Sequence, residues 1–401
     1  PMKKALLALM LGCSIAVSAQ TTETKPEENK EGFQFTTIKE VPVTPIKDQH
    51  RSSTCWSFSS VGLLEAEVLR LTGKTVDLSE MFIVSHTMQE RARLFVRLHG
   101  NATFAPGGAF SDALSVMENH GLVPQDAMPG IMYGEELPVH NELDAVAKAY
   151  VHAIAKGKFN KLTPVWADGL RGIYDAYLGE CPTQVTVDGK TMTPQEYAKS
   201  LKLDADNYVS ITSFTHHPFY TTFALEVADN WIWGQYHNVK MEEMKAIVDN
   251  AIKKGHTVAW AADVSEKGWQ WKNGVALMPA EKTADTLEGT ELARWTALSD
   301  KDREKERYNF HGYVPEIKVT QEMRQEWFDN YQTTDDHGMV IVGSAVDQDG
   351  NRYYKVQNSW DTNQIYKGFI YVSEAYFLAK TLNITVNKNV IPEKIRKNLA
   401  L

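Results

Sequence analysis

The sequence predicts an α+β fold with two lobes, one mainly helical and one built on strands. Two patterns indicate this fold. Through much of the chain, apolar residues recur at three- and four-residue steps, which is typical of helices that pack on a core. The last third holds short apolar runs separated by turn residues, which is typical of antiparallel strands. Because the helices come first and the strands last, we expect them to form two lobes.

The composition excludes several classes of protein. The chain has 401 residues, of which 43% are hydrophobic and 23% charged, as in ordinary globular proteins. It is therefore not disordered, collagen-like or polytopic in a membrane. The formal net charge of −9 provides no broad positive field for a phosphate backbone. We expect no nucleic acid partner.

The first residues resemble a bacterial secretory signal. Residues 2–19 contain a basic start at Lys3 and Lys4, an apolar run, and small residues up to a cleavage site after Ala19. The apolar run is too short to span a bilayer comfortably, so no membrane span is expected. We expect an exported protein, periplasmic or extracellular. Cys13 offers an alternative as a lipid attachment site, but the apolar run continues beyond it.

The chain divides into segments by composition. Residues 20–35 are rich in Thr, Glu, Lys and Pro and lack periodicity, which favours a flexible tether. The predicted segments are a signal peptide at 1–19, the tether at 20–35, one folded domain at 36–387 with insertions at about 125–240 and 263–333, and a tail at 388–401.

Individual elements follow from periodicity and capping residues. Residues 164–240 are mixed, and the pattern does not resolve most of their elements. The predicted helices are 55–72, 79–97, 111–121, 141–159, 193–201, 241–254 and 299–307, and the predicted strands are 257–262, 339–346, 352–357 and 368–372.

Cys55 begins the first predicted helix. Unpaired backbone N–H groups and the helix dipole favour an anion there, which lowers a thiol pKa and makes a nucleophile. The alternative is a buried, inert cysteine at a helix start. After the signal peptide the chain keeps only one other cysteine, Cys181, so at most one disulfide is possible. We expect Cys181 to be a core or loop residue.

A thiolate that attacks an amide needs a proton donor, normally His, and a group that holds the imidazole. His337 stands just before the strand 339–346. A symmetric turn at 347–350 would pair Asn358 with Met339 and make His337 a diagonal neighbour of Asn358, about 7–8 Å away. A bulge or a one-residue shift of register would break this prediction.

Gln49 is a candidate for stabilising the negative oxygen that forms during such an attack. It lies six residues before Cys55. Its side-chain NH₂ and the backbone N–H of Cys55 could supply two hydrogen-bond donors. A single Gln in a loop is usually just solvated, so the hypothesis depends on all four residues together.

These residues carry a resemblance to papain-like cysteine peptidases. The segments that match are Gln49 to Phe58, Asp77-Leu78-Ser79-Glu80, Gly107-Gly108, His337-Gly338 and Asn358-Ser359-Trp360, in the family's order. Within that superfamily the chain resembles the bleomycin hydrolase and aminopeptidase C branch. That likeness rests on Cys181-Pro182-Thr183, Asp188-Gly189-Lys190, Thr193-Pro194, Asn238-Val239 and Val390 to Glu393.

The resemblance implies a papain-like fold, with a helical lobe, an antiparallel β-barrel-like lobe and helical insertions. It also implies a thiol-dependent aminopeptidase that acts on peptides without a cofactor or metal and assembles as a homohexameric ring. The implied residues are Cys55 as nucleophile, His337 as acid and base, Asn358 as its orienting partner, Gln49 in the oxyanion hole, Trp360 as a cover over the His–Asn contact, and Gly107 and Gly108 for binding the substrate backbone.

Some features leave alternatives open. Asp361 stands where the family usually has Gly, and Gly338 where Ala is frequent. In relatives the C-terminal residues lie in the cleft, but this chain stops at Leu401. A cysteine endopeptidase or a dipeptidyl-peptidase with an open cleft is therefore an alternative, as is a non-catalytic binding protein. His216 and His217 are expected to be loop histidines, because no second cluster of ligands appears at metal-binding spacing.

Overall fold

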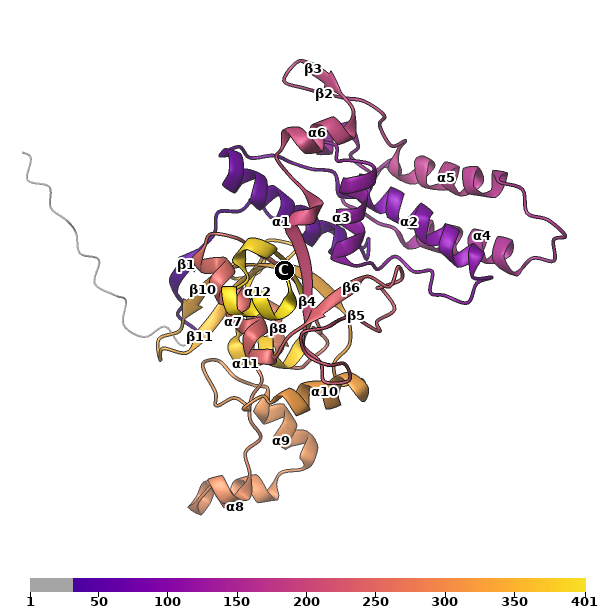
Figure 1. Cartoon of the computed structure of the whole chain (residues 1–401). Coiled ribbons are helices and arrows are strands. Elements are labelled where there is room, and N and C mark those ends of the chain that lie inside the picture. Colours follow the sequence, from indigo (N-terminus) through magenta and orange to yellow (C-terminus); the bar gives the residue numbers. More distant parts are fainter. Residues whose placement is uncertain (1–31) are drawn as a thin grey trace, which may run out of the picture.

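The computed structural model describes residues 32–401. Figure 1 shows a helical lobe beside a lobe built on a large sheet, which confirms the two-lobed α+β expectation. The predicted signal peptide, Cys13 and most of the tether lie outside the described residues. None of the helices in 32–401 is both long and apolar enough to cross a membrane.

The helical lobe comes from the first half of the chain. Its apolar faces pack into one buried cluster, as their periodicity predicts. Of its helices only the fifth was not predicted. The helices are α1 Cys55–Thr72, α2 Glu80–Arg97, α3 Phe110–Asn119, α4 Asn141–Lys156, α5 Val165–Leu178 and α6 Pro194–Ser200, with the small hairpin β2 Val185–Val187 and β3 Lys190–Met192 beside them.

The second lobe is one open sheet, in place of the barrel-like lobe that the resemblance implied. Its order is β5-β6-β4-β13-β7-β10-β11-β12-β9-β8, with β1 also paired to β10. The sheet is mixed, since β4–β6 and β9–β12 are parallel pairs. The strands are β1 Thr36–Glu40, β4 Tyr208–Thr212, β5 Thr222–Ala224, β6 Gln235–Asn238, β7 Val258–Ala262, β8 Trp269–Gln270, β9 Val275–Ala276, β10 His337–Val346, β11 Arg352–Gln357, β12 Phe369–Ser373 and β13 Thr381–Asn387.

Strand β13, the last strand of the chain, lies between β4 and β7, so the sheet pairs the end of the chain with strands from its middle. The remaining helices surround the sheet, except that α8 and α9 project from the body in Figure 1. They are α7 Met241–Lys253, α8 Gly289–Ala297, α9 Asp300–Arg307, α10 Gln321–Asp329, α11 Glu374–Lys380 and α12 Glu393–Leu399.

The β10–β11 hairpin has the predicted register at one end only. Next to the turn, Val346 pairs with Arg352, one position away from a symmetric turn. A bulge between Ile341 and Gly343 then restores the predicted pairing, so that Val340 faces Gln357. The extra residue of a bulge offsets the asymmetry of the turn. The start of β10 and the end of β11 therefore lie side by side, as predicted.

The sequence predicted that the folded domain begins at residue 36, but packed residues begin before it. The ring of Phe35 stacks on Tyr371 with 3.8 Å between ring centroids, and Phe33 lies edge-on to Tyr353. Aromatic rings in such contacts bury large apolar areas. The last residues of the predicted tether thus belong to the core on this side of the sheet.

Helix α1 packs closely on strand β10 because both present small residues. A Cβ on Gly62 would lie 3.3 Å from the side chain of Val340, and a Cβ on Gly338 would lie 2.9 Å from the hydroxyl of Ser59. The second contact is shorter than real Cβ atoms tolerate, which accounts for Gly338 where relatives often have Ala. This packing brings the first turn of α1 to the start of β10.

A buried charge cluster fixes the loop that leads into α1. The Lys47 ammonium lies 2.7 Å from Glu65 and 2.8 Å from Glu80, and it also contacts Asp77. Glu65 and Glu80 are buried, and burial raises the pKa of Glu80 to about 7 although Lys47 opposes this shift. The ammonium group of Lys47 thus balances the charges of two buried carboxylates.

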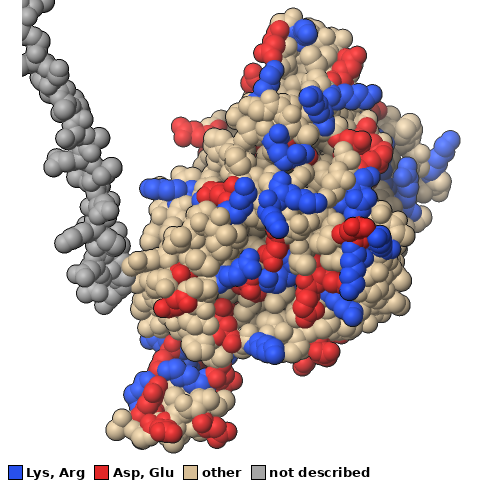
Figure 2. Space-filling model, turned by 60° about the vertical axis from the view of Figure 1, so that its left-hand side comes forward, with Lys and Arg blue, Asp and Glu red and all other residues tan. Residues whose placement is uncertain are grey.

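Charged side chains of both signs are interspersed over the face shown in Figure 2. A protein that binds a phosphate backbone gathers Lys and Arg on one surface. The face in Figure 2 does not show that pattern.

We predict that Lys47→Met lowers the free energy of unfolding by about 3–5 kcal/mol, because it leaves two buried carboxylates without their cation. Urea denaturation followed by circular dichroism measures this loss. Lys397→Met is the control, since the exposed Glu393 is the one described residue with which Lys397 forms an ion pair, and its loss should cost under about 1 kcal/mol. Equal stability of the two variants would contradict the prediction.

Candidate active site

Cys55 and His337 line one small pocket where the two lobes meet. Cys55 comes from the start of α1 and His337 from the start of β10. The pocket has about 30 Å³ of free space, enough for about two water molecules. Its other walls include Trp56, Gly108, Val227, Asp229, Tyr236, Asp335 and Asn383.

The thiol of Cys55 is not a free thiolate at neutral pH. Burial raises its pKa to about 12, and the carboxylates of Asp335 and Asp229 raise it further. Backbone N–H groups of Gly338 and Trp56 favour the thiolate but are outweighed. The helix start therefore does not lower the thiol pKa below its ordinary value, contrary to the expectation from sequence, because desolvation of the sulfur dominates.

His337 and Asn358 meet as predicted. Nε2 of His337 lies 2.7 Å from Oδ1 of Asn358. That oxygen also accepts a hydrogen bond from the Ser359 backbone N–H, which identifies it as the amide oxygen. His337 must then donate from Nε2 when its ring is neutral. Its other nitrogen, Nδ1, keeps a lone pair that can accept a proton.

The imidazole is shielded from water. The Trp360 ring stacks on His337 with 4.8 Å between centroids, and Trp271 lies edge-on to Trp360. Burial lowers the pKa of His337 to about 4, although the bond to Asn358 opposes the shift. Trp360 thus lies where the resemblance placed a cover.

The same burial raises the pKa of Cys55 and lowers the pKa of His337. It disfavours a lone thiolate and a lone imidazolium alike. Transfer of the proton from sulfur to imidazole forms both charges together, and each stabilises the other in a medium of low dielectric constant. The geometry therefore favours a thiolate that forms only with its imidazolium partner.

Gln49 is held with its amide nitrogen free. Oε1 of Gln49 accepts a hydrogen bond of 2.6 Å from the Ser359 hydroxyl, and the Gln49 backbone N–H donates to the Ser359 carbonyl at 2.8 Å. The residue after Asn358 therefore fixes Gln49 as well. The backbone N–H of Cys55 has no partner within the helix, as at every helix start. These two groups can act as donors to a developing oxyanion.

Gly107 and Gly108 are packed against the chain's own side chains. A Cβ on Gly107 would lie 2.2 Å from the carboxylate of Asp229, and a Cβ on Gly108 would lie 2.8 Å from the Trp56 ring. Position 108 therefore needs glycine because the Trp56 ring is buried, whereas a side chain at position 107 would displace the Asp229 carboxylate. Gly108 lines the pocket, whereas the surface of Gly107 is covered by Asp229.

Sequence reasoning missed several polar residues of the pocket, among them Asp335, Asp229 and Asn383. Asp335 stands two residues before His337, so its place next to the imidazole could have been read from the motif. Asp229 and Asn383 lie in segments without a motif, and only the fold brings them to the pocket. Cys181 is a half-buried free thiol that packs against the helical core, as expected.

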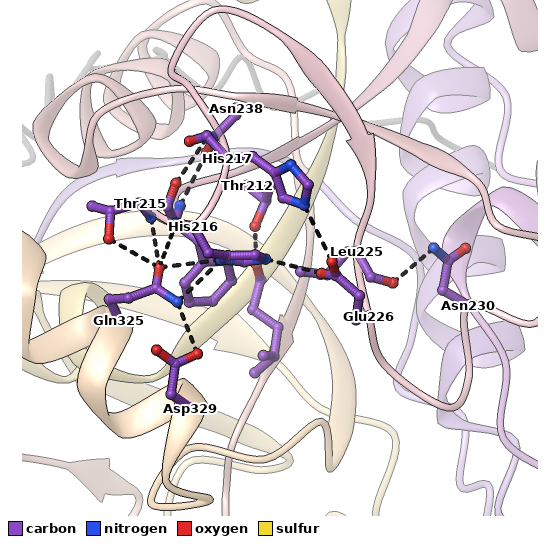
Figure 3. Close-up of polar contacts among 12 residues, drawn as sticks. Thr212, Thr215, His216, His217, Leu225, Glu226, Asn230, Asn238, Gln325 and Asp329 are labelled. Atoms are coloured by element: carbon purple, nitrogen blue, oxygen red, sulfur yellow. Dashed lines mark hydrogen bonds and ion pairs between the residues drawn. The ribbon is translucent and has the colours of Figure 1, made fainter.

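One group of described residues offers three possible ligand atoms for a metal ion. His216, His217 and Glu226 place theirs within 4.8 Å of one another (Figure 3). The Glu226 carboxylate already lies 2.9 Å from Nε2 of His216 and 3.2 Å from Nε2 of His217. His216 and His217 lie in a loop, as expected, and the loop that follows β5 brings Glu226 beside them, which spacing in the sequence does not reveal. None of the three lines the pocket of Cys55.

Two family models together match nearly all of the described residues. Residues 31–217 match the model of the papain family of cysteine proteases. Residues 185–293 and 298–400 match the model of the peptidase C1-like family.

Relatives and solved structures are distant. The chain is 21% identical to aminopeptidase C of Lactobacillus delbrueckii subsp. lactis, over 89% of this chain and 82% of that protein. It is 22% identical to the mitochondrial cysteine proteinase 1 of Saccharomyces cerevisiae, over 90% and 78%. The crystal structure of PepW from Lactobacillus rhamnosis superposes with a TM-score of 0.68 at 18% identity, covering 91% of this chain and 84% of PepW. This last likeness supports the fold.

We predict that His337→Gln slows alkylation of Cys55 by iodoacetamide at pH 7 at least about a hundredfold, because the half-buried thiol then has no partner for its proton. Peptide mapping by mass spectrometry measures labelling at Cys55 separately from Cys181. His152→Gln serves as the control, because His152 packs on Phe95 in the helical lobe. Equal labelling rates in wild type and His337→Gln would show that the imidazole does not activate the thiol.

Proposed function

The chain belongs to the peptidase C1-like family of papain-type cysteine peptidases, and we propose that it is an aminopeptidase that releases N-terminal residues from peptides. Its family makes it a cysteine-type peptidase. The finer assignment draws on relatives named aminopeptidase C and on the closure of the pocket beside Cys55.

The proposed reaction proceeds in two steps. Sγ of Cys55 attacks the carbonyl carbon of the first peptide bond while its proton passes to Nδ1 of His337. The carbonyl oxygen becomes negative and accepts hydrogen bonds from Gln49 and the Cys55 backbone. His337 then protonates the departing amine, and a thioester remains on Cys55.

Hydrolysis of the thioester completes the cycle. Neutral His337 removes a proton from water, whose oxygen attacks the thioester carbonyl carbon. Collapse of the intermediate releases the amino acid and returns the proton to the sulfur. Asn358 keeps Nε2 of His337 occupied, so that the same nitrogen, Nδ1, acts in both steps. The reaction needs no cofactor.

The loop between β5 and β6, residues 225–234, carries the argument for an exopeptidase. It places Val227 and Asp229 in the wall of the pocket. Asp229 lies directly on Gly107, where the resemblance expects the backbone of an extended substrate. A substrate residue preceding the first one would collide with this loop. The open cleft of the endopeptidase alternative is therefore not favoured.

The last residues of the chain do not block the space next to the first substrate residue. Ile395 and Leu399 of α12 are buried in the core of the second lobe, and Ala400 and Leu401 follow them. The Leu401 backbone N–H donates to the Arg396 carbonyl, and neither Ala400 nor Leu401 lines the pocket of Cys55. Among the described residues, the β5–β6 loop lines the pocket and residues 400–401 do not.

Two further expectations remain proposals. Export is supported by the layout of residues 2–19, and cell fractionation with mass measurement of the mature N-terminus tests it. A homohexamer is supported by resemblance to ring-forming relatives, and the projecting helices α8 and α9 offer surface for contacts between copies. Light scattering that gives a monomer mass at micromolar concentration would contradict the ring.

We predict that the enzyme hydrolyses aminoacyl-aminomethylcoumarin substrates at least about a hundredfold faster, by kcat/KM, than their N-acetylated forms. The reason is that an acetyl group would enter the space that Asp229 occupies. Fluorescence release measures both rates, and Cys55→Ala should abolish both. Equal hydrolysis of the two substrates would favour the endopeptidase alternative, and no hydrolysis of any peptide would favour the binding protein.

A further inference from the structure

We propose that Asp335, Asp229 and Asn383 form a binding site for the α-ammonium group of the substrate's first residue. This inference rests on the proposed aminopeptidase function and deepens it. The β5–β6 loop explains why a substrate cannot extend beyond its first residue, but it does not explain why a free N-terminal amine would bind. These three residues would attract that amine.

Asp335 is a carboxylate without a partner. No other described residue donates a hydrogen bond to its side chain or forms an ion pair with it, although it lines the pocket beside His337. Burial and the neighbouring carboxylates of Asp229 and Asp336 raise its pKa to about 7. A partly buried carboxylate without a cation is costly to the fold, so a cationic ligand would relieve it.

Asp229 adds a second carboxylate to the wall of the same pocket. Its only ion pair among the described residues is with Arg91, at 3.6 Å, which is long for a hydrogen bond. The buried Arg91 side chain also donates hydrogen bonds to the backbone carbonyls of Thr103, Gly107 and Ala228. Asp229 therefore keeps capacity to accept hydrogen bonds from a ligand.

Asn383 provides an independent indication of a ligand. It lines the same pocket, its side chain is only 4% exposed, and its Oδ1 has no hydrogen-bond partner among the described residues. A buried amide oxygen left unpaired costs about 1–3 kcal/mol. Its acceptor, together with the two carboxylates, matches the three N–H donors of a primary ammonium group.

The position of the carboxylates suits a substrate amine. Both Asp335 and Asp229 lie close enough to Cys55 to disfavour its thiolate. In the first residue of a peptide, the α-ammonium nitrogen is only two bonds from the carbonyl carbon that the sulfur attacks. An ammonium group at this site would therefore place that carbon beside Cys55. It would also offset the two charges that oppose the thiolate.

The β5–β6 loop is fixed, so Asp229 is held in place before a ligand arrives. Glu226 contacts His216 and His217, and Asn230 donates to the Leu225 carbonyl at 3.0 Å (Figure 3). Beyond Asp229, the indole of Trp231 donates to Asp112 at 3.0 Å. Such preorganisation reduces the entropy that binding costs.

The test uses Asp335→Asn in the full-length enzyme. We expect kcat/KM for an aminoacyl-aminomethylcoumarin substrate to fall about 10- to 100-fold, mainly through a higher KM, since one charged hydrogen bond is lost. The N-acetylated substrate should not lose activity. Asp188→Asn, in the exposed turn between β2 and β3, removes the same charge far from the pocket and should leave both rates unchanged.

Other readouts separate a binding role from damage. Because no described residue pairs with the Asp335 carboxylate, its Asn variant should have a thermal midpoint equal to or above that of wild type, and iodoacetamide labelling of Cys55 should not slow. Asp229→Asn should also weaken preference for the free amine. If wild type prefers free amines but both variants keep that preference in full, this inference fails while the aminopeptidase proposal stands. If wild type shows no preference, the aminopeptidase proposal itself fails.

Discussion

Close packing of helix α1 on strand β10 is the constraint from which the site follows. Gly62 and Gly338 allow the two elements to approach, so that Cys55 at the start of α1 and His337 at the start of β10 line the same pocket. A side chain larger than hydrogen at Gly338 would press on Ser59, whose hydroxyl donates to the Cys55 carbonyl at 2.6 Å. Cys55 and His337 therefore lie beside one packing contact, and Ser359, which follows the end of β11, holds Gln49.

This contact buries the reacting groups, and burial determines their chemistry. The isolated charges of thiolate and imidazolium are both disfavoured, whereas the pair can form at once. The same low dielectric constant makes unpaired carboxylates near the sulfur costly. A substrate with a positive amine satisfies Asp335 and Asp229 and removes their opposition to the thiolate. Binding of the substrate's N-terminal amine would then also favour the thiolate of Cys55.

Local chemistry made part of this site predictable. The hairpin placed Asn358 beside His337 because turn residues and alternation set its register, and the bulge at Ile341–Gly343 happened to correct a turn that is not symmetric. Short-range signals do not reveal Asp229 or Asn383, since their neighbourhood depends on strands β5, β6 and β13 joining a sheet from distant parts of the chain. The thiol pKa was predicted in the wrong direction because the degree of burial is a tertiary property.

Mass spectrometry of the acid-quenched enzyme tests the account most directly. During turnover of an unblocked peptide of known sequence, the account predicts a covalent adduct on Cys55 whose mass equals one amino acid residue, the first of the peptide. An adduct of two or more residues, an adduct on another side chain, or cleavage that leaves Cys55 unmodified throughout would contradict it.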